Sequence, residues 1–213
     1  MLVTAAEGYA RWAATWDETP SPIVALEQRL LAPILATLHP KRAIDVGCGT
    51  GRYSTQINAL GFDLSPEMLA IAGSKANLQG RLAAANMMRL PVRDGAADLV
   101  LCALTLGHAR DPIAALSELA RILEPGGTLL LTDFHPAAAA QGWRRTFRHA
   151  NTTFEIENHP YALSSTETLK LEQTIEAHIG EPERHLFDLA GRPELFEPAI
   201  RVPAVLLTRW TRP

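Results

Sequence analysis

The stretch Ala43-Ile-Asp-Val-Gly-Cys-Gly-Thr-Gly51 decides the fold of this chain, together with Gly61-Phe-Asp-Leu-Ser-Pro-Glu-Met-Leu69, which follows it closely. In each, a short apolar run typical of a buried strand leads to an acidic residue. Alternating glycines let the backbone approach a ligand, and a turn that opens a helix presents free N–H groups. Asp63 would accept both hydroxyls of a ribose. The pattern therefore predicts a site for a ligand that carries a nucleoside.

The spacing of the glycines indicates which ligand this is. A dinucleotide loop reads Gly-x-Gly-x-x-Gly. Here Gly47, Gly49 and Gly51 alternate strictly, and Arg52 stands where the third glycine would be. Asp45 suits a ligand with an ammonium group, because a carboxylate at a strand end can pair with it. The pattern resembles the class I S-adenosylmethionine-dependent methyltransferases, in particular small-molecule enzymes similar to the ubiquinone and biotin-pathway methyltransferases.

The resemblance covers about residues 9–136. Besides the glycines, it rests on Asp-Gly-Ala-Ala-Asp before an apolar run, on a histidine and an Asp-Pro pair after that run, and on a Leu-Glu-Pro-Gly-Gly-Thr turn, at 94–98, 108–112 and 123–128. It implies S-adenosylmethionine as the cofactor. The residues expected to contact it are Tyr9, Trp16, Asp45, Gly47, Cys48, Gly49, Gly51, Asp63, Leu64, Met68, Asn86, Met87, Ala103 and Leu104.

Within this set, Asp45 would lie near the methionine ammonium and Asp63 on the ribose, while Leu64 and Met68 would flank the adenine. Relatives usually offer an acid to the adenine amino group where this chain has Asn86. The amide oxygen of Asn86 can accept that hydrogen bond without charge assistance, or it can cap a turn. The sequence leaves both roles open.

Two histidines follow predicted strands and are the candidate catalytic residues. His108 comes after the fourth strand and His135 after the fifth, so both are expected at the edge of the sheet where ligands bind in open α/β folds. A histidine can take a proton from a nucleophile near neutral pH. We expect His135 to be the base and His108 the reserve, with His159 a weaker third. Alternatively, both act as caps or as structural hydrogen-bonding groups.

Apolar runs and helical spacing predict the rest of the fold. Strands are expected at 42–46, 58–63, 81–85, 97–102, 128–134, 169–179 and 199–207, and helices at 9–16, 23–38, 66–76 and 111–123. Strands that alternate with helices form a parallel sheet covered on both faces. The prediction is a doubly wound, mostly parallel, seven-stranded Rossmann-like sheet with an antiparallel C-terminal strand and an N-terminal helical lid.

The chain is expected to be one domain, 1–213. Residues 1–40 would form a helical cap, 41–136 the cofactor-binding core, and 137–213 a substrate lid with the closing strands. In the cap, Tyr9, Trp12 and Trp16 are either the core face of an amphipathic helix or, as the resemblance implies, a lid over the cofactor. The segment 142–149 holds three arginines, of which Arg144, Arg145 or Arg148 would pair with an anionic substrate, unless it is only a solvated helix face.

The connection at 52–57 is too short. A crossover between parallel strands needs about ten to twelve residues including its helix, and only six stand between Gly51 and the next strand. Relatives carry a full helix there. The shortage favours residues missing from the chain over a true deletion, because the first helix normally holds the glycine loop.

Composition limits the function classes. With 20 basic and 23 acidic residues the net charge is −3, which favours neither nucleic acid nor an anionic membrane as partner. Two cysteines make no disulfide framework, and no ligand spacing points to a metal. The start Met1-Leu-Val-Thr lacks a signal peptide's features. We expect a cytoplasmic monomer or homodimer.

The expected activity is methyl transfer from S-adenosylmethionine to an oxygen or carbon nucleophile of a small, possibly aromatic metabolite. Two alternatives remain at this point: a methyltransferase of the same fold that acts on tRNA or protein, and a cofactor-binding protein without transferase activity.

Overall fold

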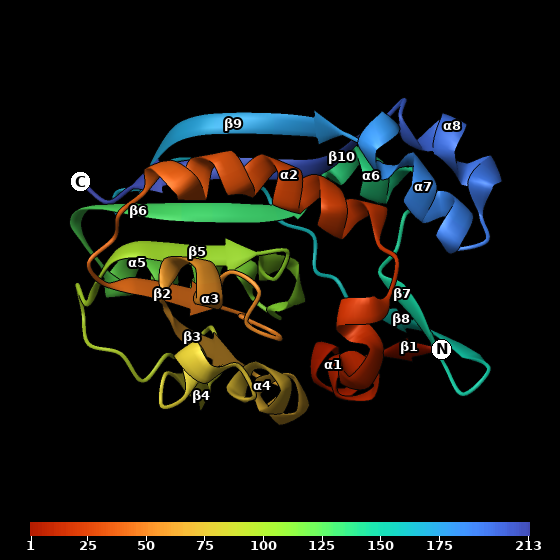
Figure 1. Ribbon diagram of the computed structural model, residues 1–213. Coiled ribbons are helices and arrows are strands. Elements are labelled where there is room, and N and C mark those ends of the chain that lie inside the picture. Colours follow the sequence, from red (N-terminus) through yellow and green to blue (C-terminus); the bar gives the residue numbers. More distant parts are fainter.

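A seven-stranded sheet forms the centre of the computed structural model, which describes residues 1–213 (Figure 1). Its strand order is β4-β3-β2-β5-β6-β10-β9. The strands are β2 (Ala43–Val46), β3 (Leu60–Asp63), β4 (Leu82–Ala84), β5 (Ala97–Ala103), β6 (Leu123–Phe134), β9 (Lys170–His178) and β10 (Pro203–Thr211). Strands β4, β3, β2, β5 and β6 run parallel to one another, and β10 is antiparallel to both β6 and β9. The predicted fold class is confirmed.

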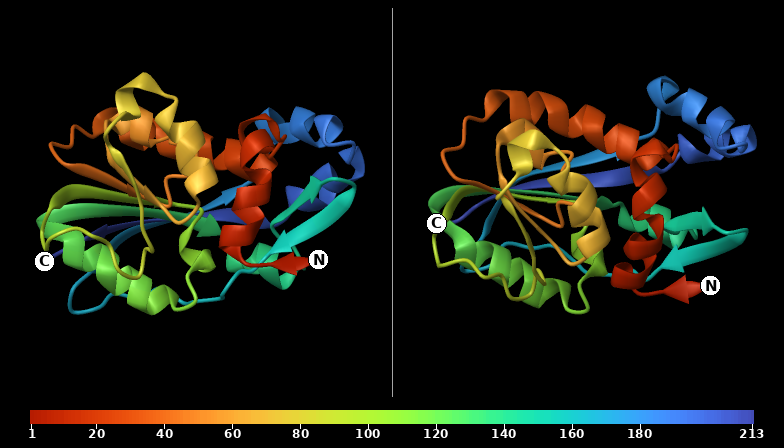
Figure 2. Two further views of the ribbon diagram at one scale, coloured as in Figure 1. Left: turned by 90° about the horizontal axis from the view of Figure 1, so that it is seen from below. Right: turned by 60° about the horizontal axis from the view of Figure 1, so that its bottom comes forward.

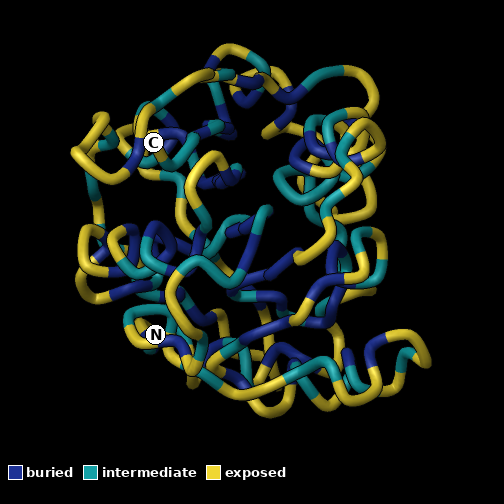
Figure 3. Tube along the Cα trace, turned by 90° about the vertical axis from the view of Figure 1, so that its left-hand side faces the viewer, coloured by how far each residue is buried: buried dark blue, intermediate teal, exposed yellow.

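Helices cover both faces of this sheet (Figure 2). On one face, α2 (Pro22–Thr37) packs Leu31 and Leu35 against Leu101 and its neighbours, and on the other face α5 (Pro112–Ile122) packs Leu119. Both helices begin with proline after a capping side chain, as helix N-termini favour. Figure 3 shows buried positions gathered in the interior and exposed positions mostly on the outer loops. No helix is long and apolar enough to cross a membrane.

Several helices were not predicted from the sequence or have other bounds than predicted. The predicted helix at 9–16 is α1 (Ala5–Trp12), continued by a 3₁₀ helix (Ala13–Glu18). Short helices are α3 (Ser54–Ile57), α4 (Pro66–Gly73), α6 (Pro136–Ala140) and α8 (Phe196–Ala199). A longer one, α7 (Glu181–Leu189), packs beside α2. Three-residue 3₁₀ turns lie at Ala76–Leu78, Leu106–His108 and Pro193–Leu195.

A second, three-stranded sheet lies beside the carboxyl ends of the central strands (Figure 1). It consists of β1 (Leu2–Val3), β8 (Thr152–Ile156) and β7 (Thr146–His149). The Trp12 ring of α1 stacks on Phe147, and Phe147 stacks on Phe154. The segment 142–149 is therefore part of a β-hairpin, and its interpretation as a helix face is wrong. We call α1, the following 3₁₀ helix and this small sheet the lid unit.

The short connection between β2 and β3 is continuous, which contradicts the prediction that residues are missing. A single turn, α3, replaces the expected helix, and Asn58 then reverses the chain at a φ of +52°. Tyr53 and Ala59 are buried against Leu31 and the sheet. These contacts supply the packing that a longer helix would otherwise provide.

Closing strand β10 starts at 203 instead of the predicted 199, because residues 196–199 form α8. Strand β6 starts five residues earlier than predicted, at Leu123. Residues 157–169 carry no helix before β9. Instead, Tyr161, Leu163 and Leu169 pack on the α5 face of the sheet.

Gly51→Ala tests the packing behind the glycine loop. Gly51 has a φ of +79°, and an added Cβ would lie 2.4 Å from Leu78 Cδ1. Gly80 has a φ of +73° but nothing within 4 Å of its Cβ position, so Gly80→Ala is the matched control. We expect Gly51→Ala to lower the free energy of unfolding by about 1–3 kcal/mol more than the control, measured by urea denaturation. Equal losses would contradict this packing.

Candidate functional site

A cavity of about 500 Å³ lies between the carboxyl ends of the central strands and the lid unit. The sequence predicts fourteen residues in contact with a cofactor, and all of them except Gly51 line this cavity. His108 lines it as well, whereas His135 does not. The structure thus brings nearly the whole predicted set together from segments that are far apart in the sequence.

The glycine loop is attached to the end of β3. The backbone N–H groups of Gly47 and Cys48 donate to the Phe62 carbonyl at 2.7 and 3.1 Å. The Cβ position of Gly49 meets no atom within 4 Å, so this glycine faces open space in the cavity. Gly51 instead faces Leu78 and Ala72, and its predicted contact with a cofactor is not supported. Its role is to let the loop pack on the layer behind it.

Asp63 lies at the carboxyl end of β3, beside the loop. Its Oδ2 accepts the Gly49 N–H at 2.7 Å, and its Oδ1 accepts the Ser65 N–H at 2.8 Å. Burial raises the pKa of Asp63, and these backbone hydrogen bonds oppose the shift. A carboxylate has about four acceptor positions, so two remain for ligand hydroxyls.

Asp45 is a buried carboxyl at the end of β2, only 2% exposed. It accepts a hydrogen bond from Ser54 Oγ at 2.6 Å. Burial, with the nearby charges of Asp63 and Glu27 in addition, raises the pKa of Asp45 to about 7. Such a group ionises more readily when a cation enters the cavity, because an opposite charge favours the carboxylate form.

The expected adenine side of the cavity contains both exposed and buried groups. Leu64 is 52% exposed and Met68 is fully buried in α4. Asn86 Oδ1 accepts the Met88 N–H at 2.9 Å, so the amide caps a turn, one of the two roles that the sequence allowed. The Met87 side chain packs against the core cluster at the same place.

The lid unit contributes aromatic side chains. Tyr9 and Trp16 line the cavity, with their ring centroids 5.4 Å apart in an edge-on arrangement. Asp17 accepts a hydrogen bond from Thr50 Oγ1 at 2.8 Å and so joins the lid unit to the glycine loop. The aromatic cluster is therefore both the core of the lid unit and a wall of the cavity.

His108 is a half-buried hydrogen-bonding group. Its Nδ1 lies 2.9 Å from the Glu157 carbonyl oxygen and therefore carries the proton, so Nε2 is the acceptor. Arg145 Nη1 donates to Nε2 at 2.7 Å, and the Tyr9 hydroxyl lies 3.0 Å from it. Burial and the Arg145 charge lower the pKa of His108. A neutral ring with an occupied lone pair is not arranged to act as a base.

His135 lies outside the cavity, which contradicts its assignment as the general base. Its Nδ1 accepts the Ala137 N–H at 3.1 Å and caps α6, and its Nε2 lies 3.3 Å from Glu176 on β9. Asp133, two residues earlier, does not face it. Asp133 instead binds Arg145 and accepts the Tyr161 hydroxyl at 2.8 Å.

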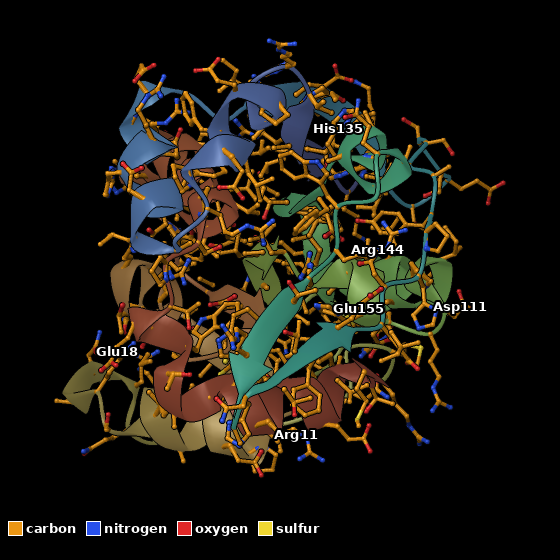
Figure 4. All side chains as sticks on the ribbon, turned by 90° about the vertical axis from the view of Figure 1, so that its right-hand side faces the viewer. Arg11, Glu18, Asp111, His135, Arg144 and Glu155 are labelled. Atoms are coloured by element: carbon orange, nitrogen blue, oxygen red, sulfur yellow. The ribbon has the colours of Figure 1, made fainter.

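Sequence reasoning missed one acidic group in the cavity wall and left open which of three arginines lies there. Glu27, on α2, accepts hydrogen bonds from Tyr53 and Thr132, and burial raises its pKa. Glu27 is the only acid of a mostly apolar helix, which was the available signal. Arg145, one of three predicted arginines, is buried and also donates to the Leu104 carbonyl. Arg144 points to Glu155 on the neighbouring strand (Figure 4), and Arg148 is exposed and does not line the cavity.

Comparisons with known proteins agree with this architecture. Residues 44–131 match the family model described as a methyltransferase domain. A demethylmenaquinone methyltransferase from Deinococcus radiodurans is 36% identical over 110 residues, which cover 47% of this chain and 46% of that protein. The chain spans about half the length of the curated relatives that it matches.

Solved structures show the same fold over most of the chain. An S-adenosylmethionine-dependent methyltransferase from Mesorhizobium loti has a TM-score of 0.66 at 20% identity, covering 89% of this chain and 100% of that one. The N-methyltransferase NodS from Bradyrhizobium japonicum, in complex with S-adenosyl-L-homocysteine, has a TM-score of 0.66 at 15% identity, covering 99% and 100%. Residues 44–131 are therefore similar to a methyltransferase domain, and the whole chain has the fold of solved S-adenosylmethionine-dependent methyltransferases.

Proposed function

We propose that this protein binds S-adenosylmethionine and transfers its methyl group to a small molecule. The observation that carries the proposal is the position of Asp63, which lines the cavity beside the open face of Gly49 at the end of β3. A carboxylate there has acceptor positions for both hydroxyls of a ribose. The relative named demethylmenaquinone methyltransferase favours a small acceptor.

The residues of the cavity fit the cofactor. Asp45 is a buried carboxyl with no cationic partner, as an incoming ammonium requires. Gly49 leaves space for close approach, Asp63 would hold the ribose, and Leu64 with Met68 would enclose the adenine. Arg52, which follows the loop and lines the cavity, is placed to pair with the methionine carboxylate. When bound, the cofactor supplies a methyl group on a sulfonium, which reacts by direct displacement.

Positioning is the main contribution of the protein in this proposal. An aligned nucleophile and methyl group can remove about 7–11 kcal/mol of the barrier without acid or base catalysis. The lid unit lines the cavity with Tyr9, Trp12 and Trp16, whose rings would shield the reacting atoms from water. Neither His108 nor His135 is arranged as a base, so we assign neither a proton-transfer role.

Asp63→Ala tests the ribose assignment. Losing hydrogen bonds to a charged group costs about 1.5–3 kcal/mol, so the Kd for S-adenosylmethionine should rise about tenfold to 150-fold in calorimetry. Asp98→Ala is the matched control, because Asp98 also accepts two backbone N–H groups, from Lys41 and Arg42, but does not line the cavity. The control should keep its affinity. Unchanged binding by Asp63→Ala, or comparable binding of a nicotinamide dinucleotide, would contradict the proposal.

Proton release on cofactor binding tests Asp45. Its pKa is about 7 in the free protein, and a bound ammonium would lower it. Affinity should therefore fall as the pH is lowered through about 7, and binding near that pH should release protons. Calorimetry in two buffers of different ionisation enthalpy measures the release. Asp45→Asn, which can still accept from Ser54, should bind more weakly and lose this release; a wild-type affinity independent of pH would refute the assignment.

A further inference from the structure

Glu27 is a buried carboxyl in the cavity wall to which the cofactor assignment gives no role. It lies in the middle of α2 and is 1% exposed. Its Oε2 accepts the Tyr53 hydroxyl, and its Oε1 accepts the Thr132 hydroxyl at 2.8 Å. Each oxygen of a carboxylate has a further lone pair. The group can therefore accept one more hydrogen bond from a molecule in the cavity.

The Glu27 carboxyl lies where β5 and β6 end side by side. Thr132 pairs with Ala103 across these strands, and its Oγ1 also accepts the Leu104 N–H at 3.0 Å. Leu104 has a φ of +53°, a left-handed conformation that is uncommon for such a residue and is often found at functional sites. Two strands, β2 and β5, separate β6 from β3 and its Asp63. Glu27 thus lies away from the ribose and adenine side of the cavity.

The charge of Glu27 is not balanced by a salt bridge. Two cations act on Glu27 from nearby without forming an ion pair: Arg52, whose effect is the larger, and Arg145, whose guanidinium is engaged by Asp133. The other fully buried glutamate, Glu183 on α7, has the partner that Glu27 lacks, because Arg29 binds it at 2.8 Å. A buried carboxylate without a cation is costly, and a hydrogen-bond donor lowers that cost whereas an anion raises it.

We propose that Glu27 determines acceptor specificity by accepting a hydrogen bond from the group to be methylated, so that the acceptor is a hydroxyl or amine compound and not a carboxylate. This inference rests on the proposed function, because it places the acceptor in the same cavity as the cofactor. The aromatic and apolar walls formed by Trp12, Trp16 and Phe134 suit an acceptor with a ring.

Three single-ring probes test this proposal: catechol, benzylamine and benzoate. Their binding to the protein saturated with S-adenosyl-L-homocysteine is measured by calorimetry, for wild type, Glu27→Gln and Glu183→Gln. Glu27→Gln keeps the size of the side chain and an acceptor oxygen. Glu183→Gln is the matched control, because it makes the same change at a buried glutamate outside the cavity.

We expect the wild type to bind catechol or benzylamine about tenfold or more tightly than benzoate, as a hydrogen bond to a charged group implies. Glu27→Gln should lose this preference while its affinity for S-adenosyl-L-homocysteine stays unchanged, and Glu183→Gln should keep both. The inference is overturned if benzoate binds as well as the donors, if none of the probes binds, or if Glu27→Gln keeps the preference. Failure of the wild type to bind S-adenosyl-L-homocysteine would instead overturn the proposed function.

Discussion

The attachment of the glycine loop to the end of β3 is the interaction on which the site depends. The Phe62 carbonyl accepts two loop N–H groups, and the next side chain, Asp63, accepts a third from Gly49. These bonds connect the ends of two neighbouring parallel strands, β2 and β3. Because the same acidic group also lines the cavity, the feature that orders the loop is the one expected to bind the ligand. A ligand bound to Asp63 would therefore be held by the same carboxylate that orders the glycine loop.

A second network joins the lid unit to the sheet. Arg145 of the hairpin reaches Asp133 at the end of β6 and His108 after β5, while Tyr9 of α1 contacts the same ring nitrogen of His108. Asp133 is buried and the other three groups are half-buried, so their hydrogen bonds are strengthened by the reduced local dielectric and each depends on the others. The network occupies the acid-base groups of Asp133 and His108 with hydrogen bonds that join the lid unit to the sheet.

The fold class is confirmed, and the predicted features that agree with the structure are those with a local physical cause. Alternating glycines and the acids Asp45 and Asp63 require a particular backbone at strand ends, and the structure places them around one cavity. The errors concern side-chain direction and long-range packing. His135 follows a strand as predicted, yet its ring caps α6, because the chain turns immediately after β6. Gly51 belongs to the motif, but its missing Cβ makes room for Leu78 rather than for a ligand.

The sequence by itself determined the parallel core, its strand ends and the resemblance to methyltransferases, because hydrophobic runs, glycine spacing and acids after strands are local signals. Only the tertiary structure decided the lid sheet, the one-turn crossover at α3 and the position of Glu27. The lid sheet pairs residues 2–3 with 155–156, and Glu27 meets Thr132 from more than a hundred positions away. Such contacts depend on how distant segments pack, and no periodicity or spacing in a single sequence encodes which of them will meet.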